Sequence, residues 1–317
     1  MKFNPKARLD TKQIRDRRGR ATSGGGGLPG LPTGRGGLPS GLPVGGGIVG
    51  VIIALVIAFV VWKSGGGEPS GSSASTEAGT SSDSDVVERC QTGADANKYK
   101  DCAIVADVNS IQSYWTNALP QQTGTTYTAV PTTWFTGSTS TGCGNATSAV
   151  GPFYCPADKV VYIDLTFFHD MLQGQLGASG GPFAEAYVLA HEYGHHVQDL
   201  LGTMDQVKTQ QGPKSDSVRL ELQADCFAGI WAKYATTAQD AGGEPFILDL
   251  TTDDINRALD SARAVGDDRI QQQTSGRVDP DQWTHGSSAE RQHWFTVGMT
   301  DGTIKACDTF GTDNLDG

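Results

Sequence analysis

The chain has 317 residues, which is long enough for two domains, and its 24 Lys or Arg against 35 Asp or Glu give a net charge of -11. Residues 1–47 are basic, with nine Lys or Arg and two Asp or Glu, so nearly all acidic residues follow residue 63. An acidic main part cannot neutralise phosphates, which excludes nucleic acid as a partner. We interpret the acidity as a source of solubility.

The first part of the chain cannot pack into a core. Residues 1–47 start with a basic stretch and continue as a repeat of Gly, Leu and Pro. Such a composition offers too little apolar surface to offset the entropy of folding. We therefore expect residues 1–47 to be flexible.

Residues 48–62 contain no charged or polar side chain apart from the indole of Trp62. With the three preceding glycines they span roughly 27 Å as a helix, about the thickness of a bilayer's hydrocarbon core. The alternative is a cleaved signal peptide, which normally has a short basic region and a small-residue cleavage site. The long basic segment before the apolar run favours a retained single transmembrane helix. Its basic flank then predicts cytoplasmic residues 1–47 and an extracytoplasmic remainder.

The rest of the chain divides into a linker and a domain. Residues 63–85 are rich in Gly, Ser and Thr without periodicity, which predicts a flexible linker. Residues 86–317 have a globular composition and are numerous enough for a full core. We expect this part to be the one folded domain, outside the cytoplasm.

The six cysteines all lie in the expected domain. An even number of cysteines outside the cytoplasm predicts three disulfides, and none forms the C-x-x-C pair of a metal site. Sequence alone permits fifteen pairings. Proximity along the chain favours two pairs and leaves a third, namely Cys90–Cys102, Cys143–Cys155 and Cys226–Cys307.

Apolar periodicity predicts a mainly helical α+β domain with a small antiparallel sheet. The first long helix should end at Pro120, because proline cannot continue the backbone hydrogen-bond ladder. The expected helices cover residues 104–119, 183–201, 215–234, 251–265 and 287–299, and the expected strands cover 127–135 and 159–165.

His191, Glu192 and His195 form an H-E-x-x-H motif in a predicted helix that Pro182 begins and Gly202 follows. The two histidines are four residues apart and so lie on one helical face. Neutral imidazoles presented in this way can bind one Zn²⁺, with Glu192 as general base. A helical histidine is more often a packing residue, but here the helix is predicted independently and further candidate ligands follow.

A catalytic zinc site requires a third protein ligand and one position open to water. Glu221 and Asp225 share one face of the next long helix, so one carboxylate can reach the metal while the other holds a ligand imidazole. Their surroundings are mostly apolar, which makes a buried carboxylate costly without a partner. The residues alone leave Glu221 and Asp225 interchangeable.

His-Glu-x-x-His followed by Glu221-x-x-Ala224-Asp225 resembles the gluzincin pattern, and the chain more closely resembles the bacterial putative neutral zinc metallopeptidase family. This resemblance covers roughly residues 86–310 and implies a zincin-like fold, a Zn²⁺ cofactor and a peptide or protein substrate. It also implies Glu221 as third ligand and Asp225 as support for a ligand histidine. The matching motifs occur in order at residues 151–158, 161–164, 191–198, 221–227 and 285–291, with a basic match at 16–19.

The resemblance extends to His285 and Arg291, which are six residues apart. It implies that His285 donates a hydrogen bond to the oxyanion formed during hydrolysis. Arg291 then lies near the cleft or pairs with a carboxylate. Zinc-activated water would attack the peptide bond while Glu192 transfers its proton, and residues 151–165 would offer an edge strand to the substrate.

Three other functions remain open at this stage. The domain can be a zinc amidase that acts on cell-wall peptide cross-links. It can also be a non-catalytic, zinc-stabilised and membrane-tethered binding or scaffold protein, although a purely structural site has no need of the base Glu192. A cation-buffering adhesion module is the third alternative, and no calcium-loop pattern supports it.

Overall fold

The computed structural model describes residues 1–19 and 83–317. The transmembrane helix predicted at 48–62 and residues 63–82 of the linker predicted at 63–85 lie outside the described residues. Residues 83–85 of that predicted linker are helical and begin α2. Within the two described ranges, no helix is both long and apolar enough to cross a membrane.

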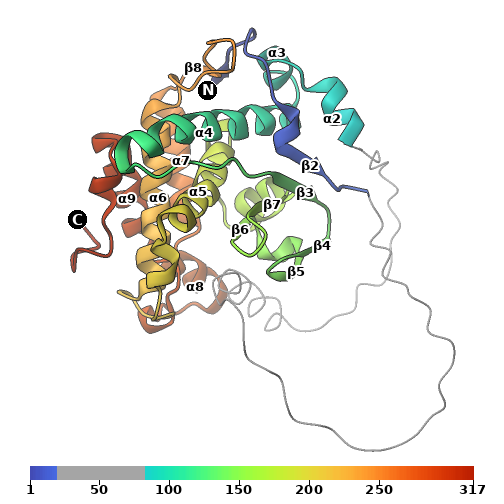
Figure 1. Ribbon diagram of the computed structural model, residues 1–317. Helices are drawn as coiled ribbons and strands as arrows, with labels where there is room; N and C mark the ends of the chain where they lie inside the picture. The colour runs from blue at the N-terminus through green and yellow to red at the C-terminus, as the bar shows by residue number, and fades with distance from the viewer. Residues whose placement is uncertain (20–82) are drawn as a thin grey trace, which may run out of the picture.

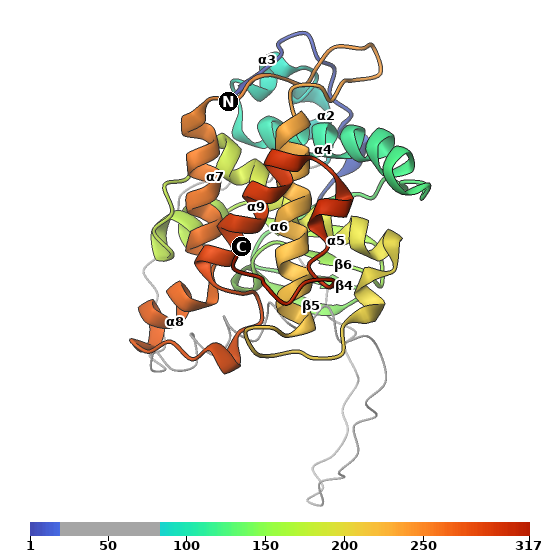
Figure 2. The same ribbon diagram turned by 90° about the vertical axis from the view of Figure 1, so that its left-hand side faces the viewer.

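Long helices build the body of the molecule. α5 (Pro182–Leu201) and α6 (Asp216–Tyr234) pack together at its centre, and α4 (Lys100–Thr123), α7 (Thr252–Ala264) and α9 (Ser288–Asp301) surround them (Figure 1). Figure 2 shows α9 lying along α6. The shorter helices are α2 (Asp83–Arg89), α3 (Gly93–Ala96), α8 (Asp267–Ser275) and the π-helical η4 (Phe168–Gln175). The 3-10 turns are η1 (Thr11–Gln13), η3 (Ser148–Val150), η5 (Thr203–Gln206), η6 (Pro280–Gln282) and η7 (Ile304–Cys307).

Two glycines bring α6 and α9 into backbone contact. A Cβ atom on Gly298 of α9 would lie 1.9 Å from the carbonyl oxygen of Cys226, and one on Gly229 of α6 would lie 2.1 Å from that of Phe295. Neither position has room for a side chain, so the two helices approach more closely than helices with ordinary side chains at the contact. This contact fixes α9 against the helix that carries Glu221.

The largest sheet among the described residues is mixed. Its strand order is β2 (Ile14–Asp16), β3 (Thr132–Phe135), β7 (Val160–Asp164) and β6 (Phe153–Cys155). The first three strands are parallel, and β6 pairs antiparallel with β7 at the edge. The α+β class is confirmed, but the single antiparallel sheet is wrong, because long connections carry the chain back to the same end of the sheet before β3 and β7.

Two small antiparallel pairs lie beside the main sheet. β1 (Lys2–Phe3) pairs with β8 (Ile247–Asp249), and β4 (Ser138–Thr141) pairs with β5 (Gly144–Thr147). The flexibility predicted for residues 1–47 is therefore wrong for residues 2–16, which form two strands of the fold. Their local composition gave no sign of this, because the partners of β1 and β2 lie far away in the sequence.

The ends of two helices test the local predictions. α5 begins at Pro182 and is followed by Gly202 in the left-handed conformation, with φ 72°, as predicted. α4 was predicted to end at Pro120 but continues to Thr123, where Gly124 has φ 77°. A proline in the last turn removes only one backbone hydrogen bond, so the helix can include it.

All six cysteines are among the described residues, and all are paired. The three predicted disulfides are confirmed. Cys226–Cys307 joins α6 to the C-terminal turn η7, and Cys143–Cys155 joins the β4–β5 hairpin to edge strand β6. Cys90–Cys102 links the segments on either side of α3.

Candidate metal centre

The predicted zinc ligands meet between α5 and α6. His191 and His195 come from α5 and Glu221 from α6, and one ligand atom of each lies within 4.8 Å of the other two. Glu221 Oε2 is 3.1 Å from His191 Nε2, and Glu221 Oε1 is 3.4 Å from His195 Nε2. All three side chains are buried. The structure thus selects Glu221, rather than Asp225, as the carboxylate that faces both imidazoles.

Asp225 lies one helical turn beyond Glu221 and contacts the ring nitrogen of His191 that does not face Glu221. Its Oδ1 atom is 2.8 Å from His191 Nδ1 and accepts a hydrogen bond from the Tyr187 hydroxyl at 2.5 Å. Arg291 donates to the other oxygen, with Nε 2.8 Å from Oδ2. Although burial opposes it, the charges of Arg291 and His191 lower the pKa of Asp225 to about 2. An ionised Asp225 leaves His191 Nε2 directed toward the metal position.

His195 has a different support. Its Nδ1 atom is 2.8 Å from Oε1 of Gln198, whose amide nitrogen donates to the Leu220 carbonyl at 2.7 Å and to Gln223 Oε1 at 3.1 Å. Gln198 therefore fixes both the ring of His195 and the spacing of α5 from α6. The sequence motif at 191–198 includes Gln198 but assigns it no role, although Gln198 lies three residues after the second histidine, where one helical turn brings a side chain to the same face.

Glu192 lies beside the three ligands. It is 4 % exposed, and its Oε2 atom has no hydrogen-bond partner among the described residues, while the backbone N–H of Tyr154 in β6 donates to the carboxyl group. Burial raises the pKa of Glu192 to about 8. A buried polar atom without a partner requires a ligand or water beside it. The position suits a residue that exchanges a proton with a water molecule.

His285 lines the same cleft as Glu192. Its Nδ1 atom lies 2.8 Å from the Thr284 hydroxyl and 3.3 Å from Asp267 Oδ1. The other oxygen of Asp267 accepts the backbone N–H groups of Thr284, His285 and Gly286, and so shapes the loop. Although burial opposes it, the hydrogen bond and charge of Asp267 raise the pKa of His285. Asp267 was missed in the sequence because it lies 18 residues earlier, at the start of α8.

An apolar cleft opens onto these residues. Its volume is about 500 Å³, and His191, Glu192, Glu221, His285 and Arg291 lie along one side. The remaining wall comes from η3, η4 and α8, among other elements, and is mostly apolar. Its apolar side chains include Phe167, Met171, Leu176, Val188, Val265 and Ile270.

The donor set fits zinc. Two imidazole nitrogens and one carboxylate are the ligands of many catalytic zinc sites, and each imidazole has a partner on its second nitrogen. Among the described residues, no fourth His, Cys, Asp or Glu joins the group of His191, His195 and Glu221. One coordination position is therefore left for water or substrate. The predicted ligands, Glu192, Asp225, Arg291 and His285 are all brought together here.

The chain is similar to several uncharacterized bacterial proteins. The uncharacterized proteins Mb2605 of Mycobacterium bovis and Rv2575 of Mycobacterium tuberculosis are each 52% identical over 231 residues, 72% of this chain and 77% of theirs. The uncharacterized protein YpfJ of Escherichia coli is 48% identical over 197 residues, 60% of this chain and 65% of its own. No solved structure matches. The family model described as "putative neutral zinc metallopeptidase" matches residues 2–310, and the chain belongs to this family.

Proposed function

We propose that this protein is a zinc-dependent peptidase that hydrolyses peptide bonds. The observation that carries the proposal is the buried Oε2 atom of Glu192, which has no hydrogen-bond partner in the part of the chain that the structure describes and lies next to two histidines and a glutamate with zinc-ligand chemistry. A structural zinc site has no need of such a group, since all four of its positions are filled by protein. The family membership supports the same conclusion.

The residues of the site divide the reaction between them. Bound zinc would lower the pKa of water and polarise the scissile carbonyl. Glu192 accepts the proton of the attacking water and passes it to the leaving amine. His285 donates a hydrogen bond to the developing oxyanion, held in place by Asp267.

The surroundings of the site suit an extended peptide with an apolar side chain. Strand β6 is the edge of the main sheet, and its Tyr154 N–H already reaches Glu192, so a peptide beside β6 passes over the ligands. The cleft next to it can bury one bulky apolar residue of the peptide, because η4 and α8 line it with Met171 and Ile270. We therefore assign bulky apolar residues next to the scissile bond as the preference.

Replacing the proposed base tests the function. Glu192→Gln keeps the shape of the side chain and removes its ability to take a proton, so the purified variant should bind zinc in a one-to-one ratio and lose peptide hydrolysis. Glu88→Gln, on exposed α2, is the matched control and should keep full activity. Persistence of hydrolysis in Glu192→Gln would refute the assignment.

Assays on peptides and on peptidoglycan separate two of the three alternatives from the proposed peptidase. A zinc amidase of cell-wall cross-links would release fragments from peptidoglycan and leave ordinary peptides intact. A zinc-stabilised scaffold would bind the metal and hydrolyse neither. The predicted membrane attachment and extracytoplasmic domain belong to this proposal, and the three disulfides support an oxidising compartment.

A further inference from the structure

We propose that residues 1–18, here called the amino-terminal arm, lie in the same compartment as residues 83–317 and form one folded unit with them. A single membrane crossing by residues 48–62 would place the arm and the domain on opposite sides. The contacts between them leave no room for that arrangement in the folded protein. This inference is independent of the proposed peptidase activity.

The arm completes the main sheet. Strand β2 pairs with β3 over three residues, and the N–H of Arg17 donates to the Trp134 carbonyl at 2.9 Å just beyond it. Without the arm, β3 would be an edge strand with a row of unpaired backbone groups. Trp134 of β3 is fully buried, and the Arg18 guanidinium lies over its ring, 4.8 Å from the ring centre. Loss of the arm would expose this surface.

Two amide side chains of the domain bind the backbone of the arm, the buried Asn109 and the exposed Asn97. Asn109 of α4 accepts from the N–H of Asp10 at 2.7 Å and donates to its carbonyl at 3.1 Å. Asn97 does the same with Phe3, at 3.1 and 2.9 Å. Asn109 is 2 % exposed, so without the arm its amide would be left buried and unpaired or would require water to enter. The presence of the arm therefore accounts for a buried asparagine at position 109.

The close approach of the two backbones also requires the arm. The Asn4 carbonyl oxygen lies 1.9 Å from where a Cβ atom on Gly93 would be, and the N–H of Gly93 donates to the Ala7 carbonyl at 2.8 Å. A residue with a side chain at position 93 would displace the arm. Ala7 itself is fully buried. The domain surface is therefore shaped to fit this segment of the chain.

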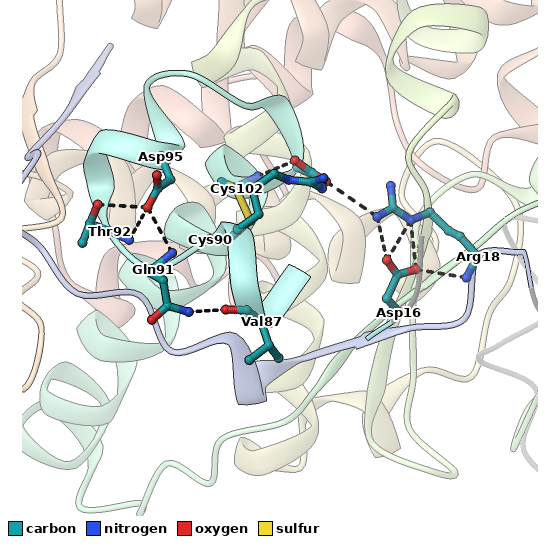
Figure 3. Close-up of a disulfide and its surroundings, with 10 residues drawn as sticks. Asp16, Arg18, Val87, Cys90, Gln91, Thr92, Asp95 and Cys102 are labelled. Carbon is teal, nitrogen blue, oxygen red and sulfur yellow. Dashed lines mark hydrogen bonds and ion pairs between the residues drawn. A yellow bond between two sulfur atoms is a disulfide. The ribbon is translucent and has the colours of Figure 1, made fainter. Parts of the chain in front are cut away.

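Ion pairs hold the end of the arm where the described residues break off. Arg18 donates to Asp16 at 2.6 Å (Figure 3) and lies 3.7 Å from Asp101, which also pairs with Arg89. Asp101 precedes Cys102, whose disulfide to Cys90 braces this corner. These contacts join a residue that precedes the 20–82 stretch to residues that follow it.

The arm also supports the metal centre through the sheet. The hydroxyl of Thr132 in β3, the strand that β2 covers, lies 2.7 Å from the hydroxyl of Tyr193. Tyr193 is between Glu192 and His195 on α5. Displacement of the arm would therefore change the strand against which the zinc-binding helix rests. An arm on the far side of a membrane could not provide this support.

A cysteine pair tests docking in the full-length protein in cells. Arg8 and Thr92 face each other in an antiparallel bridge. The flanking residues make the hydrogen bonds, from Leu9 N–H to the Gln91 carbonyl and from Gly93 N–H to the Ala7 carbonyl, so Arg8 and Thr92 are a non-hydrogen-bonded pair. Cα atoms in such pairs are about 4.5 Å apart, within the range of a disulfide. Arg8→Cys combined with Thr92→Cys, after mild oxidation of sealed membranes, should yield the linked peptide in most molecules. Either single variant should yield none.

Labelling tests the compartment with a second pair of variants. Lys12→Cys on the arm and Asp313→Cys on the domain both replace exposed residues. A maleimide that cannot cross membranes should label both in intact cells, or both only after permeabilisation. Labelling of the two from opposite sides would overturn the proposal. Labelling from one side without the Arg8–Thr92 link would overturn the claim that arm and domain are one folded unit.

Discussion

Gly194 lies directly against Ala224, at the point where α5 and α6 cross. A Cβ atom on Gly194 would be 2.9 Å from the Ala224 carbonyl oxygen and 3.1 Å from its Cα atom. Since both atoms belong to the backbone of α6, neither can move without moving the helix. The contact sets the spacing between the histidines of α5 and Glu221, and hence the size of the metal centre.

Gly194→Ala should therefore loosen the metal centre. The extra methyl group forces α6 outward, which should lower the free energy of unfolding by about 1–3 kcal/mol and weaken zinc binding. Thermal unfolding with and without zinc measures the two effects separately. Gly194→Val should be worse in both. An alanine variant with unchanged zinc affinity would show that α6 tolerates the shift.

Asp225→Asn should weaken zinc binding without removing a ligand. The amide keeps the size of the side chain but no longer stabilises the His191 ring as a carboxylate does, and it leaves the buried Arg291 charge uncompensated. Loss of such an outer partner typically costs about 10–100-fold in metal affinity. A competition titration with a chelator measures the change. Asp267→Asn provides a comparison, since it should leave zinc affinity nearly intact.

His285→Ala should lower kcat and leave KM nearly unchanged, because the hydrogen bond to the oxyanion forms only as the reaction proceeds. The expected loss is about 10²–10³-fold. Asp267→Asn should give a smaller loss in kcat, through a misplaced His285 loop. Steady-state kinetics on one peptide measures both. An equal fall in substrate binding for His285→Ala would instead indicate a role in holding the peptide.

Ile270→Trp should fill part of the apolar cleft. Peptides with a bulky apolar residue next to the cleaved bond should then be hydrolysed less efficiently, mainly through a higher KM, while peptides with a small residue there should be affected little. Val278→Trp is the control, because Val278 is 38 % exposed and does not line this cleft. Equal losses on all peptides would mean that the cleft does not select the side chain.

Asn109→Ala should destabilise the protein by about 1–3 kcal/mol, because the backbone groups of Asp10 lose their buried partner. Asn117→Ala on the same helix is the matched control, since Asn117 is exposed and bonds only to Ser113 one turn earlier. Urea unfolding of the full chain measures both. Equal stability of the two variants would show that the arm contributes little at this point.

The sequence was informative where function depends on local spacing. The separation of four residues between His191 and His195 follows from helical geometry, and the gap from Glu221 to Asp225 does so as well. It was uninformative where distant segments meet. Strand β2 has its partner more than a hundred residues away. The basic residues near it look like a flexible tail in the sequence, whereas in the structure Arg18 pairs with acidic side chains. The position of Asp267 under the histidine loop had no sequence signal for the same reason.

The glycine contact between α6 and α9 determines which parts of the molecule can move. Two helices that touch through their backbones, at Gly229 and Gly298, and that share the Asp225–Arg291 ion pair must travel as a single rigid block. Any narrowing of the cleft would consequently have to come from other lining elements, among them η3, η4 and α8. The surface that α6 and α9 present to the cleft would therefore stay fixed while those other elements move.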